Sequence, residues 1–536
     1  MFSASCALFL ALSLIISKRK RLLSLGWCCE AWHSAALPKK SISMISSSQF
    51  PLVESAYSRL PQPFYRLANP TPVKRPSVVL WNSELAGELG LDKVKDSNQL
   101  AALFSGNQTL PGSKPLATAY AGHQFGHFVP QLGDGRAILL GEAVGSDGVR
   151  HEIQLKGAGP TPFSRNGDGR SSLGPVLREY LVSEAMHALG IPTTRALAAT
   201  VTGEKVFRER VLPGAVFTRV ARSHIRVGTF QYFAARRDLA AVRTLADHVI
   251  ESFFPAITNE GQRYRAFFVA VRDAQAALIA RWMQVGFIHG VMNTDNMSIL
   301  GDTIDYGPCA FMDAYDPATV YSAIDQLGRY AYANQPYIAA WNLARLGETL
   351  LELIDPDQGK AIAWAEDAVR AFMSAYDANW LRGMKAKIGL IADLPEDLSL
   401  VEQLLDAMHK GKADFTLTFR RLAATVDGGA DSAVTSLFIE PGIVEQWLSR
   451  WRERLSNESR PPADIAREMQ RINPAFILRN HRIERAIDSA VEEGDFSKAI
   501  ELHAVLARPF DDQPAFAGYL EPPRPGDWKC KTFCGT

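Results

Sequence analysis

Two short segments decide the fold of this chain: residues 289–296 read His-Gly-Val-Met-Asn-Thr-Asp-Asn, and residues 305–307 read Asp-Tyr-Gly. Asn296 and Asp305 offer side-chain oxygens, the ligands that Mg²⁺ or Mn²⁺ takes when it also binds phosphate oxygens. Val291 carries an apolar side chain that cannot accept a proton. The two segments therefore predict a metal–nucleotide site that lacks a proton acceptor at residue 291.

The spacing of these residues is that of the protein-kinase catalytic loop, in which His-Arg-Asp-Leu-x-x-x-Asn precedes Asp-Phe-Gly. His289 and Asn296 align with the first and last residues of that loop without a gap, and Asp305 aligns with the second metal ligand. The kinase catalytic base falls on Val291. Either the nucleotide is only bound, or a different transfer takes place with another base.

Two close glycines and two predicted strands lie upstream of these segments. Gly133 and Gly135 lead into residues 137–142, a short apolar run typical of a buried strand. Close glycines allow main-chain N–H groups to approach phosphate oxygens. The second predicted strand, residues 152–156, ends on Lys156, and in kinases a lysine at this place pairs with nucleotide phosphates and with a helix glutamate.

A helical pattern follows at residues 175–186, with apolar residues four positions apart. Glu179 and Glu184 both lie on this helix, and either can pair with Lys156. We choose Glu179, because its place along the helix puts it nearer the predicted cleft.

Further candidate phosphate ligands lie on either side of this helix and beyond it. Asp168 and Gly169 belong to a Gly/Ser-rich loop that can fold over a nucleotide. Arg219 and Arg226 can make forked contacts to phosphate oxygens. From the sequence alone, these two arginines can equally be surface cations.

Several longer motifs resemble those of the selenoprotein O family. The resemblance extends from about residue 50 to the C-terminus, and its motifs are long and specific. They are residues 121–127 (Ala-Gly-His-Gln-Phe-Gly-His), 130–137, 289–296, 304–308, 473–474 and 478–480.

The resemblance implies an α+β, two-lobed protein-kinase-like fold with a small strand-rich N-lobe and an enlarged helical C-lobe. It also implies protein adenylylation, in which AMP passes from ATP to Ser, Thr or Tyr hydroxyls of protein substrates, with UTP as the alternative nucleotide donor. The alternatives are a catalytically inactive pseudokinase scaffold that binds nucleotide, and a kinase with an unusual base.

The resemblance further assigns roles to individual residues. Asp295 matches the proposed proton acceptor, and Glu179 matches the helix glutamate that pairs with the lysine. Asn296 and Asp305 match the ligands of Mg²⁺ or Mn²⁺, and Asp305 thereby also contacts the nucleotide. The implied nucleotide ligands are Gly133, Gly135, Arg136, Lys156, Asp168, Gly169, Arg219 and Arg226.

Composition and spacing exclude several other classes of function. His123 and His127 have the spacing of a zinc-binding helix, but the catalytic Glu of such helices is missing and a Gly lies between them, so we expect them to line the cleft or to be structural. Basic residues are scattered and the net charge is +1, which indicates no nucleic-acid surface. We expect a monomer that does not associate with membranes.

The chain contains six cysteines in 536 residues, which favours a reducing compartment over a disulfide scaffold. The resemblance suggests a redox link for Cys534, near the place where some family members carry selenocysteine. Cys309 or Cys530 are the candidate partners, and a mobile polar tail without redox function is the alternative.

We predict four parts of the chain. Residues 1–47 contain no acidic residue before Glu30 and are either a mitochondrial presequence or an over-extended start that precedes Met44; we favour the second, and hence a cytoplasmic protein. Residues 48–215 form the N-lobe, and residues 216–520 the helical C-lobe. The tail is residues 521–536, and helical patterns in the C-lobe are expected at residues 264–285, 359–378, 397–411, 442–455 and 475–491.

Overall fold

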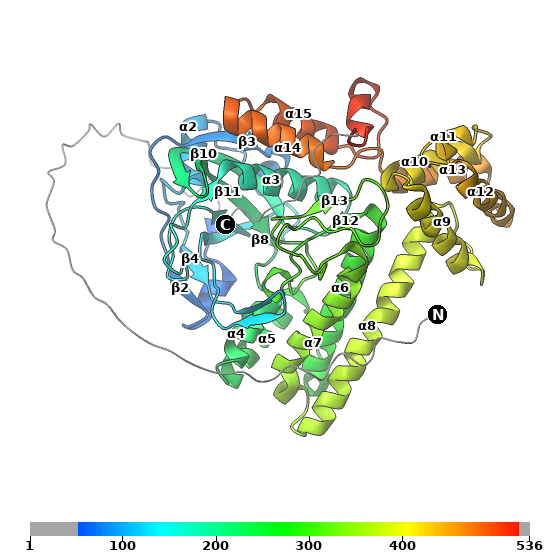
Figure 1. Cartoon of the computed structure of the whole chain (residues 1–536). Coiled ribbons are helices and arrows are strands. Elements are labelled where there is room, and N and C mark those ends of the chain that lie inside the picture. Colours follow the sequence, from blue (N-terminus) through cyan, green and yellow to red (C-terminus); the bar gives the residue numbers. More distant parts are fainter. Residues whose placement is uncertain (1–51, 525–536) are drawn as a thin grey trace, which may run out of the picture. The chain divides into compact units, whose positions relative to one another are not determined.

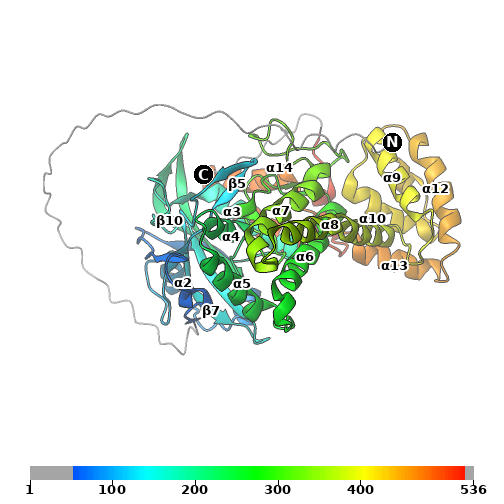
Figure 2. The ribbon, with the colours of Figure 1, turned by 90° about the horizontal axis from the view of Figure 1, so that it is seen from below.

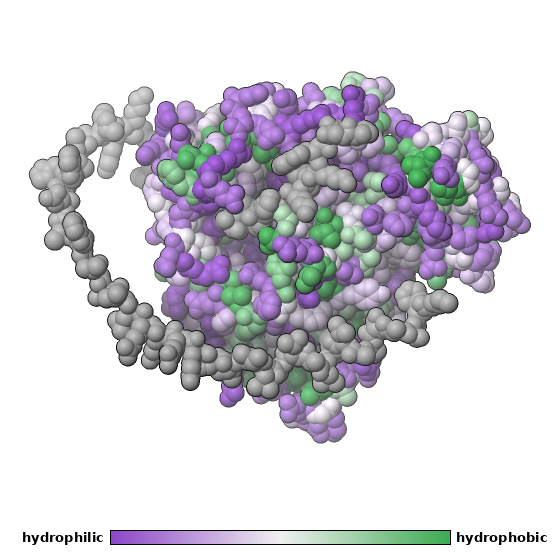
Figure 3. All heavy atoms as spheres, in the orientation of Figure 1, coloured by the Kyte–Doolittle hydropathy of each residue, from purple (hydrophilic) through white to green (hydrophobic). Residues whose placement is uncertain are grey.

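The computed structural model describes residues 52–524. The N-terminal extension, Cys530 and Cys534 lie outside the described residues, so the predictions for them stay predictions. Within residues 52–524, no helix is both long and apolar enough to cross a membrane. Polar residues cover much of the face in Figure 3, with apolar patches between them.

The first half of the described chain builds an antiparallel sheet, nine-stranded within these residues. Its main order is β2-β4-β7-β8-β11-β10-β3; β1 pairs with β7 and β9 pairs with β11. The sheet lies at the left of Figure 1. The strands are β1 (Leu52–Val53), β2 (Tyr65–Leu67), β3 (Ser77–Trp81), β4 (Leu116–Thr118), β7 (Ala137–Val144), β8 (Arg150–Lys156), β9 (Ser171–Ser172), β10 (Arg195–Phe207) and β11 (Val211–Ala221).

The two strands predicted before the helix are confirmed as β7 and β8. All residues of β7 except the last are buried, in agreement with its apolar run. Strand β11 continues to Ala221 and so crosses the boundary that we placed between residues 215 and 216. Helices in this half are α1 (Ser83–Glu88), α2 (Ser97–Phe104) and α3 (Leu173–Ala188).

Helix α3 is the predicted glutamate-bearing helix. It packs on β10 and β11 and also contacts α14 and α15 (Figure 1). Because it has neighbours on more than one side, most of its residues are buried. This packing fixes its direction relative to β8, on which Lys156 lies.

Helices dominate after β11, which makes the class α+β, as predicted; the likeness to protein kinases stays a prediction. The remaining strands are the short pairs β5 (Gly122–Gln124) with β6 (His127–Val129) and β12 (Phe287–Ile288) with β13 (Ala310–Phe311). The helices are α4 (Val227–Ala234), α5 (Leu239–Phe253), α6 (Arg263–Val285), α7 (Gln335–Ile354), α8 (Gln358–Lys387), α9 (Asp397–Gly411), α10 (Phe415–Val426), α11 (Ser432–Thr435), α12 (Gly442–Leu455), α13 (Pro462–Ile472), α14 (Asn480–Asp488) and α15 (Ser497–Leu506).

The predicted helix before the catalytic loop is confirmed as α6. Gly286 ends it in a left-handed conformation, with φ +72°. The β12–β13 pair then closes the base of the loop that carries residues 289–309. His289 is fully buried, and its Nε2 lies 3.0 Å from the carbonyl oxygen of Ile304. The buried His289 side chain therefore fixes the conformation of this loop.

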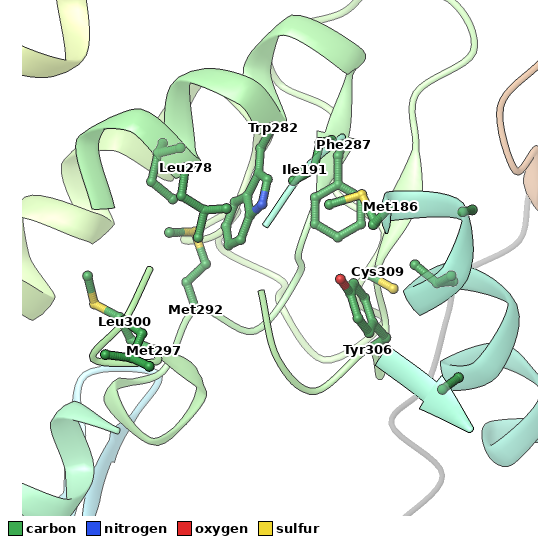
Figure 4. Packing of buried hydrophobic residues seen from close by; sticks show 14 of the residues in the cluster. Met186, Ile191, Leu278, Trp282, Phe287, Met292, Met297, Leu300, Tyr306 and Cys309 are labelled. Carbon is green, nitrogen blue, oxygen red and sulfur yellow. The ribbon is translucent and has the colours of Figure 1, made fainter. Parts of the chain in front are cut away.

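A hydrophobic cluster supports this loop (Figure 4). Trp282 on α6 stacks on the His289 ring, with centroids 5.4 Å apart, and donates a hydrogen bond to Thr303 Oγ1 at 2.9 Å. Cys309 belongs to the same cluster and is fully buried, and this burial raises the pKa of its thiol to about 12. Such a thiol is a poor thiolate source, so Cys309 is a poor partner for a redox link.

The helices expected at 397–411 and 442–455 are confirmed as α9 and α12, whereas α10, α13 and α15 were not predicted. Two further helices differ from the prediction in their bounds. The helix expected at 359–378 extends to Lys387 as α8, and the one expected at 475–491 starts only at Asn480. In the second case the main-chain N–H of Arg479 donates to the carbonyl oxygen of Ile477 at 2.9 Å and not to that of Ala475, so no helical turn forms before Asn480. Figure 2 shows α9, α10, α12 and α13 gathered together; α10 packs on α13 and α9 on α12.

Candidate active site

A cleft of about 250 Å³ opens at the ends of β7, β8 and β11. It brings together nine residues that the sequence predicted as nucleotide ligands. These are Gly133, Gly135, Arg136, Lys156, Asp168, Gly169, Arg219, Arg226 and Asp305.

The loop that contains Gly133 and Gly135 lines the cleft, and at these two residues only main-chain atoms are available. Gly133 has φ +71°, and a Cβ placed there would lie 2.3 Å from the Phe163 ring. Between the two glycines, Asp134 accepts hydrogen bonds from Thr118 Oγ1 at 2.6 Å and from Gln154 Nε2 at 3.2 Å. Asp134 therefore fixes the loop onto β4 and β8. We did not predict this role, although a carboxylate between two glycines is a usable signal for it.

Lys156 at the end of β8 is the centre of an ion-pair network. Its Nζ donates to Glu179 Oε2 at 2.6 Å and to Asp305 Oδ1. Glu179 also accepts from Arg219 at 3.2 Å. The choice of Glu179 as the partner of Lys156 is confirmed, and the network connects the sheet, α3 and the loop after the catalytic segment.

Glu184, the alternative, lies one turn further along α3 and points into another cluster. Its carboxylate accepts from Arg195 Nε at 3.0 Å, from Asn82 Nδ2 at 2.8 Å and from the main-chain N–H of Ala196 at 2.7 Å. Glu184 thus ties α3 to the strand-rich part of the chain and has no place in the cleft.

The two glutamates are expected to respond differently to substitution. Glu184→Ala removes the carboxylate partner of the Arg195 guanidinium and the acceptor of the buried main-chain N–H of Ala196, so we expect a loss of about 3–5 kcal/mol in the free energy of unfolding. Glu179→Gln is expected to weaken ATP binding because Lys156 loses its orienting partner. Urea unfolding and equilibrium ATP binding on both variants test this, and an ATP defect confined to the Glu184 variant would contradict the assignment.

Arg219 and Arg226 are not surface cations. Only 1% of Arg219 and 4% of Arg226 is exposed. Arg219 donates to Gln154 Oε1 at 2.6 Å, and Arg226 lies over the Tyr120 ring at 4.6 Å and donates to the carbonyl oxygen of Asp295 at 3.0 Å. Both guanidinium groups line the cleft, where phosphate oxygens can accept from them.

The Asp168–Gly169 loop covers one side of the cleft. Gly169 has φ +65°, and a Cβ there would lie 2.0 Å from the carbonyl oxygen of Gly159, so only glycine fits. Asp168 makes a two-pronged contact with Arg208 at 2.9 and 3.0 Å, and this contact holds the pKa of Asp168 below its ordinary value. Arg208, in the β10–β11 turn, is a cleft residue that we did not predict.

Asp305 combines an unusual backbone conformation with a dense cationic environment. Its φ is +71°, a left-handed value that non-glycine residues rarely adopt. Burial alone would raise the pKa of Asp305, but the charges of Lys156, Arg219 and Arg226 hold it well below its ordinary value. Asp305 is therefore a fixed anion in the cleft.

Asp295 and Asn296 lie in a short turn, η3 (Thr294–Asn296), beside the cleft rather than among its lining residues. Asp295 Oδ2 accepts from Gln124 Nε2 at 3.2 Å, whereas its buried Oδ1 has no hydrogen-bond partner. Burial raises the pKa of Asp295 to about 6. Asn296 Nδ2 donates to the carbonyl oxygen of Val291 at 3.1 Å, which fixes the orientation of its amide.

The donor set fits a hard cation that shares its shell with phosphate. Within residues 52–524, no group of three or more His, Cys, Asp or Glu side chains forms a metal cage. The carboxylate of Asp305 and the side-chain amide oxygen of Asn296 can supply two oxygens, and Mg²⁺ typically takes one or two protein carboxylates plus phosphate and water. His123 and His127 lie on the β5–β6 hairpin, not on a helix, so the zinc-helix spacing is coincidental.

The charge of the cleft indicates the class of ligand. Among the described residues, its lining contains three carboxylates, Asp134, Asp168 and Asp305, and seven cationic side chains. The cations are Arg136, Lys156, Arg165, Arg170, Arg208, Arg219 and Arg226. Such an excess of cations in a partly closed space favours a polyanion such as a nucleoside triphosphate.

Comparison with known proteins gives a consistent result. The family described as protein adenylyltransferase SelO matches residues 51–507. The chain is 62% identical over 486 residues to the protein nucleotidyltransferase YdiU of Rhizobium rhizogenes, covering 90% of this chain and 96% of that protein. It is 60% identical over 484 residues to the protein of the same name from Rhizobium meliloti, covering 90% of this chain and 99% of that protein.

Proposed function

Because this chain belongs to the family of the protein adenylyltransferase SelO, we propose that it transfers AMP from ATP to Ser, Thr or Tyr hydroxyls of proteins. The observation that carries the proposal is Val291, which is 6% exposed and occupies the place of the kinase catalytic base. The cleft contains the cationic side chains that can bind phosphate, but residue 291 offers no base to activate a hydroxyl for attack on the γ-phosphate.

In the proposed reaction the acceptor oxygen attacks the α-phosphorus, the bond to the bridging oxygen breaks, and pyrophosphate leaves. Asp295 accepts the hydroxyl proton, since its Oδ1 is buried without a partner. Arg219 and Arg226 bind phosphate oxygens, and Lys156 is oriented for the same task by Glu179.

Asn296 and Asp305 would hold Mg²⁺ or Mn²⁺, which when bound neutralises charge on the phosphate oxygens. We propose ATP as the nucleotide donor. UTP is the alternative donor, and its transfer rate is to be compared with that of ATP. We also propose that the protein acts as a monomer in the cytoplasm, a compartment in keeping with six cysteines in 536 residues.

Labelled nucleotides test the proposal directly. We expect label from the α-phosphate of ATP, and not from the γ-phosphate, to become covalently attached to protein, including the enzyme itself. The measurement is autoradiography of denatured protein after incubation with Mg²⁺ or Mn²⁺. Transfer of γ-label alone would establish a kinase, and ATP binding without transfer of either label would establish a scaffold.

A further inference from the structure

Cationic and aromatic side chains gather beside the catalytic loop, where the β5–β6 hairpin meets α7. Figure 2 shows the positions of β5 and α7. The Arg329 guanidinium lies 4.8 Å from the centre of the Trp341 ring, and Arg345 lies 5.0 Å from the same ring. His123 on β5 packs edge-on to Trp341 at 5.2 Å. We call these four residues, Arg329, Trp341, Arg345 and His123, the Arg329 patch.

Hydrogen bonds place the Arg329 patch next to Asp295. Tyr330, which follows Arg329, donates from its hydroxyl to Asn293 Oδ1 at 2.6 Å. Asn293 Oδ1 also accepts from the main-chain N–H of Phe125 at 3.1 Å, in the turn of the hairpin. The preceding residue, Gln124, is the one that donates to Asp295. The patch therefore borders the carboxylate that we propose as proton acceptor.

Arg329 has no carboxylate partner among residues 52–524, and its buried Nε has no hydrogen-bond partner. Its guanidinium lies over the Trp341 and Tyr330 rings and hydrogen-bonds the Tyr330 side chain, so an acidic partner is still available to it. The nearby Asp325 carboxylate instead accepts from the main-chain N–H groups of Arg329 and Tyr330, at 2.9 and 2.8 Å. Arg345, by contrast, forms an ion pair with Glu348 at 2.5 Å.

Residues around the Arg329 patch are exposed to solvent, so another protein can reach it. Leu327, two residues before Arg329, is 97% exposed, and Phe128, which packs on His123 at 4.9 Å, is 40% exposed. Arg329 itself is only partly buried. A partly buried arginine in a patch whose neighbours include exposed apolar side chains is suited to a carboxylate flanked by apolar residues on another protein.

We propose that Arg329 binds an acidic side chain of the acceptor protein, close in sequence to the hydroxyl that is modified. The proposal rests on the proposed function, because it assigns the Arg329 patch to the acceptor. Carboxylate binding by a guanidinium is charge-assisted and can be two-pronged, so it contributes both affinity and orientation of the acceptor. The preferred substrates are thus acidic segments that contain Ser, Thr or Tyr.

Peptide binding tests this without requiring transfer. Two fluorescent peptides share a Ser within an apolar segment; one has Asp and Glu around the Ser, and the other has Asn and Gln. Anisotropy is measured with the full chain, Mg²⁺ and a non-hydrolysable ATP analogue. We expect the acidic peptide to bind at least about tenfold more tightly than the Asn/Gln peptide. Equal binding of the two peptides to the unmodified protein would overturn the proposal.

Variants locate the effect. Arg329→Gln is expected to remove the preference for the acidic peptide, and Arg329→Lys to retain part of it, with ATP affinity unchanged in both. The matched control is Arg243→Gln, because Arg243 on α5 also lies over an aromatic ring, Tyr264, at 5.6 Å. A full preference in Arg329→Gln, or its loss in Arg243→Gln, would overturn the assignment.

The two proposals fail separately. If the acidic preference depends on Arg329 but no α-label is transferred, only the proposed AMP transfer is wrong. If α-label is transferred and the peptides bind equally, the transfer stands and the role of Arg329 is wrong.

Discussion

Asp305→Ala is expected to abolish transfer of α-label, with a fall in rate of at least about 100-fold. The carboxylate of Asp305 is the anion that faces Lys156, Arg219 and Arg226 in the cleft, and it is a proposed metal ligand. Losing a preorganised electrostatic contact of this kind typically costs about 3 kcal/mol or more in the transition state. Single-turnover rates and ATP affinity at several Mg²⁺ concentrations measure the effect, and ATP binding with Mg²⁺ is expected to weaken as well.

Asp305→Asn is the control for the backbone. Asp305 has φ +71°, a conformation that Asn tolerates better than Ala, so the Asn variant retains the local fold and removes only the charge. We expect it to be nearly as inactive as the Ala variant. Activity close to normal in Asp305→Asn would show that charge at this position is not required. Normal activity in Asp305→Ala would show that residues 305–307 form only a structural turn.

Asp295→Asn is expected to slow transfer by about 10²–10⁴-fold, the usual range for a positioned acid–base group. ATP affinity is expected to stay within a few-fold, because Asn296 and Asp305 are unchanged and the main-chain contact of residue 295 with Arg226 does not involve the side chain. The oxygen of an Asn side chain can still accept from Gln124, so the orientation of the turn is preserved. The measurement pairs ATP affinity with the single-turnover rate.

Metal titration distinguishes the role of base from a role in metal binding. If Asp295 contacts the metal, directly or through water, the Asn variant loses metal affinity and rate together. Excess Mg²⁺ or Mn²⁺ would then restore much of the rate. Such rescue would contradict the assignment of Asp295 as proton acceptor.

The parts of the site that depend on order along the chain were predictable. The strand that ends on Lys156, the helix with Glu179 and the long helix before His289 are local patterns, and each is confirmed. The choice between Glu179 and Glu184 was weaker, because it depends on how α3 is rotated against β10 and β11. Only packing determines that rotation.

Contacts between distant segments could not be predicted from the sequence. Arg208 enters the cleft because the long β10–β11 hairpin turns back over the Asp168 loop. Gln124 reaches Asp295 across 171 positions of sequence. Residues 475–479 match a helical pattern, yet the N–H groups of Ala475 and Phe476 donate to Pro509 and that of Arg479 donates to Ile477. Such pairings depend on tertiary geometry, which overrides local propensity.

The ammonium of Lys156 acts as a resident counter-ion for Asp305 when the cleft holds no ligand. The negative charge of Asp305 is thus already compensated in the folded chain, and ligand binding exchanges one cation for another instead of creating a buried ion pair anew. A free divalent ion must displace this ammonium without offering it a new anion, whereas a triphosphate brings oxygens to which the ammonium can turn. The cleft is therefore expected to take up nucleotide and metal together, and to have little affinity for the metal alone.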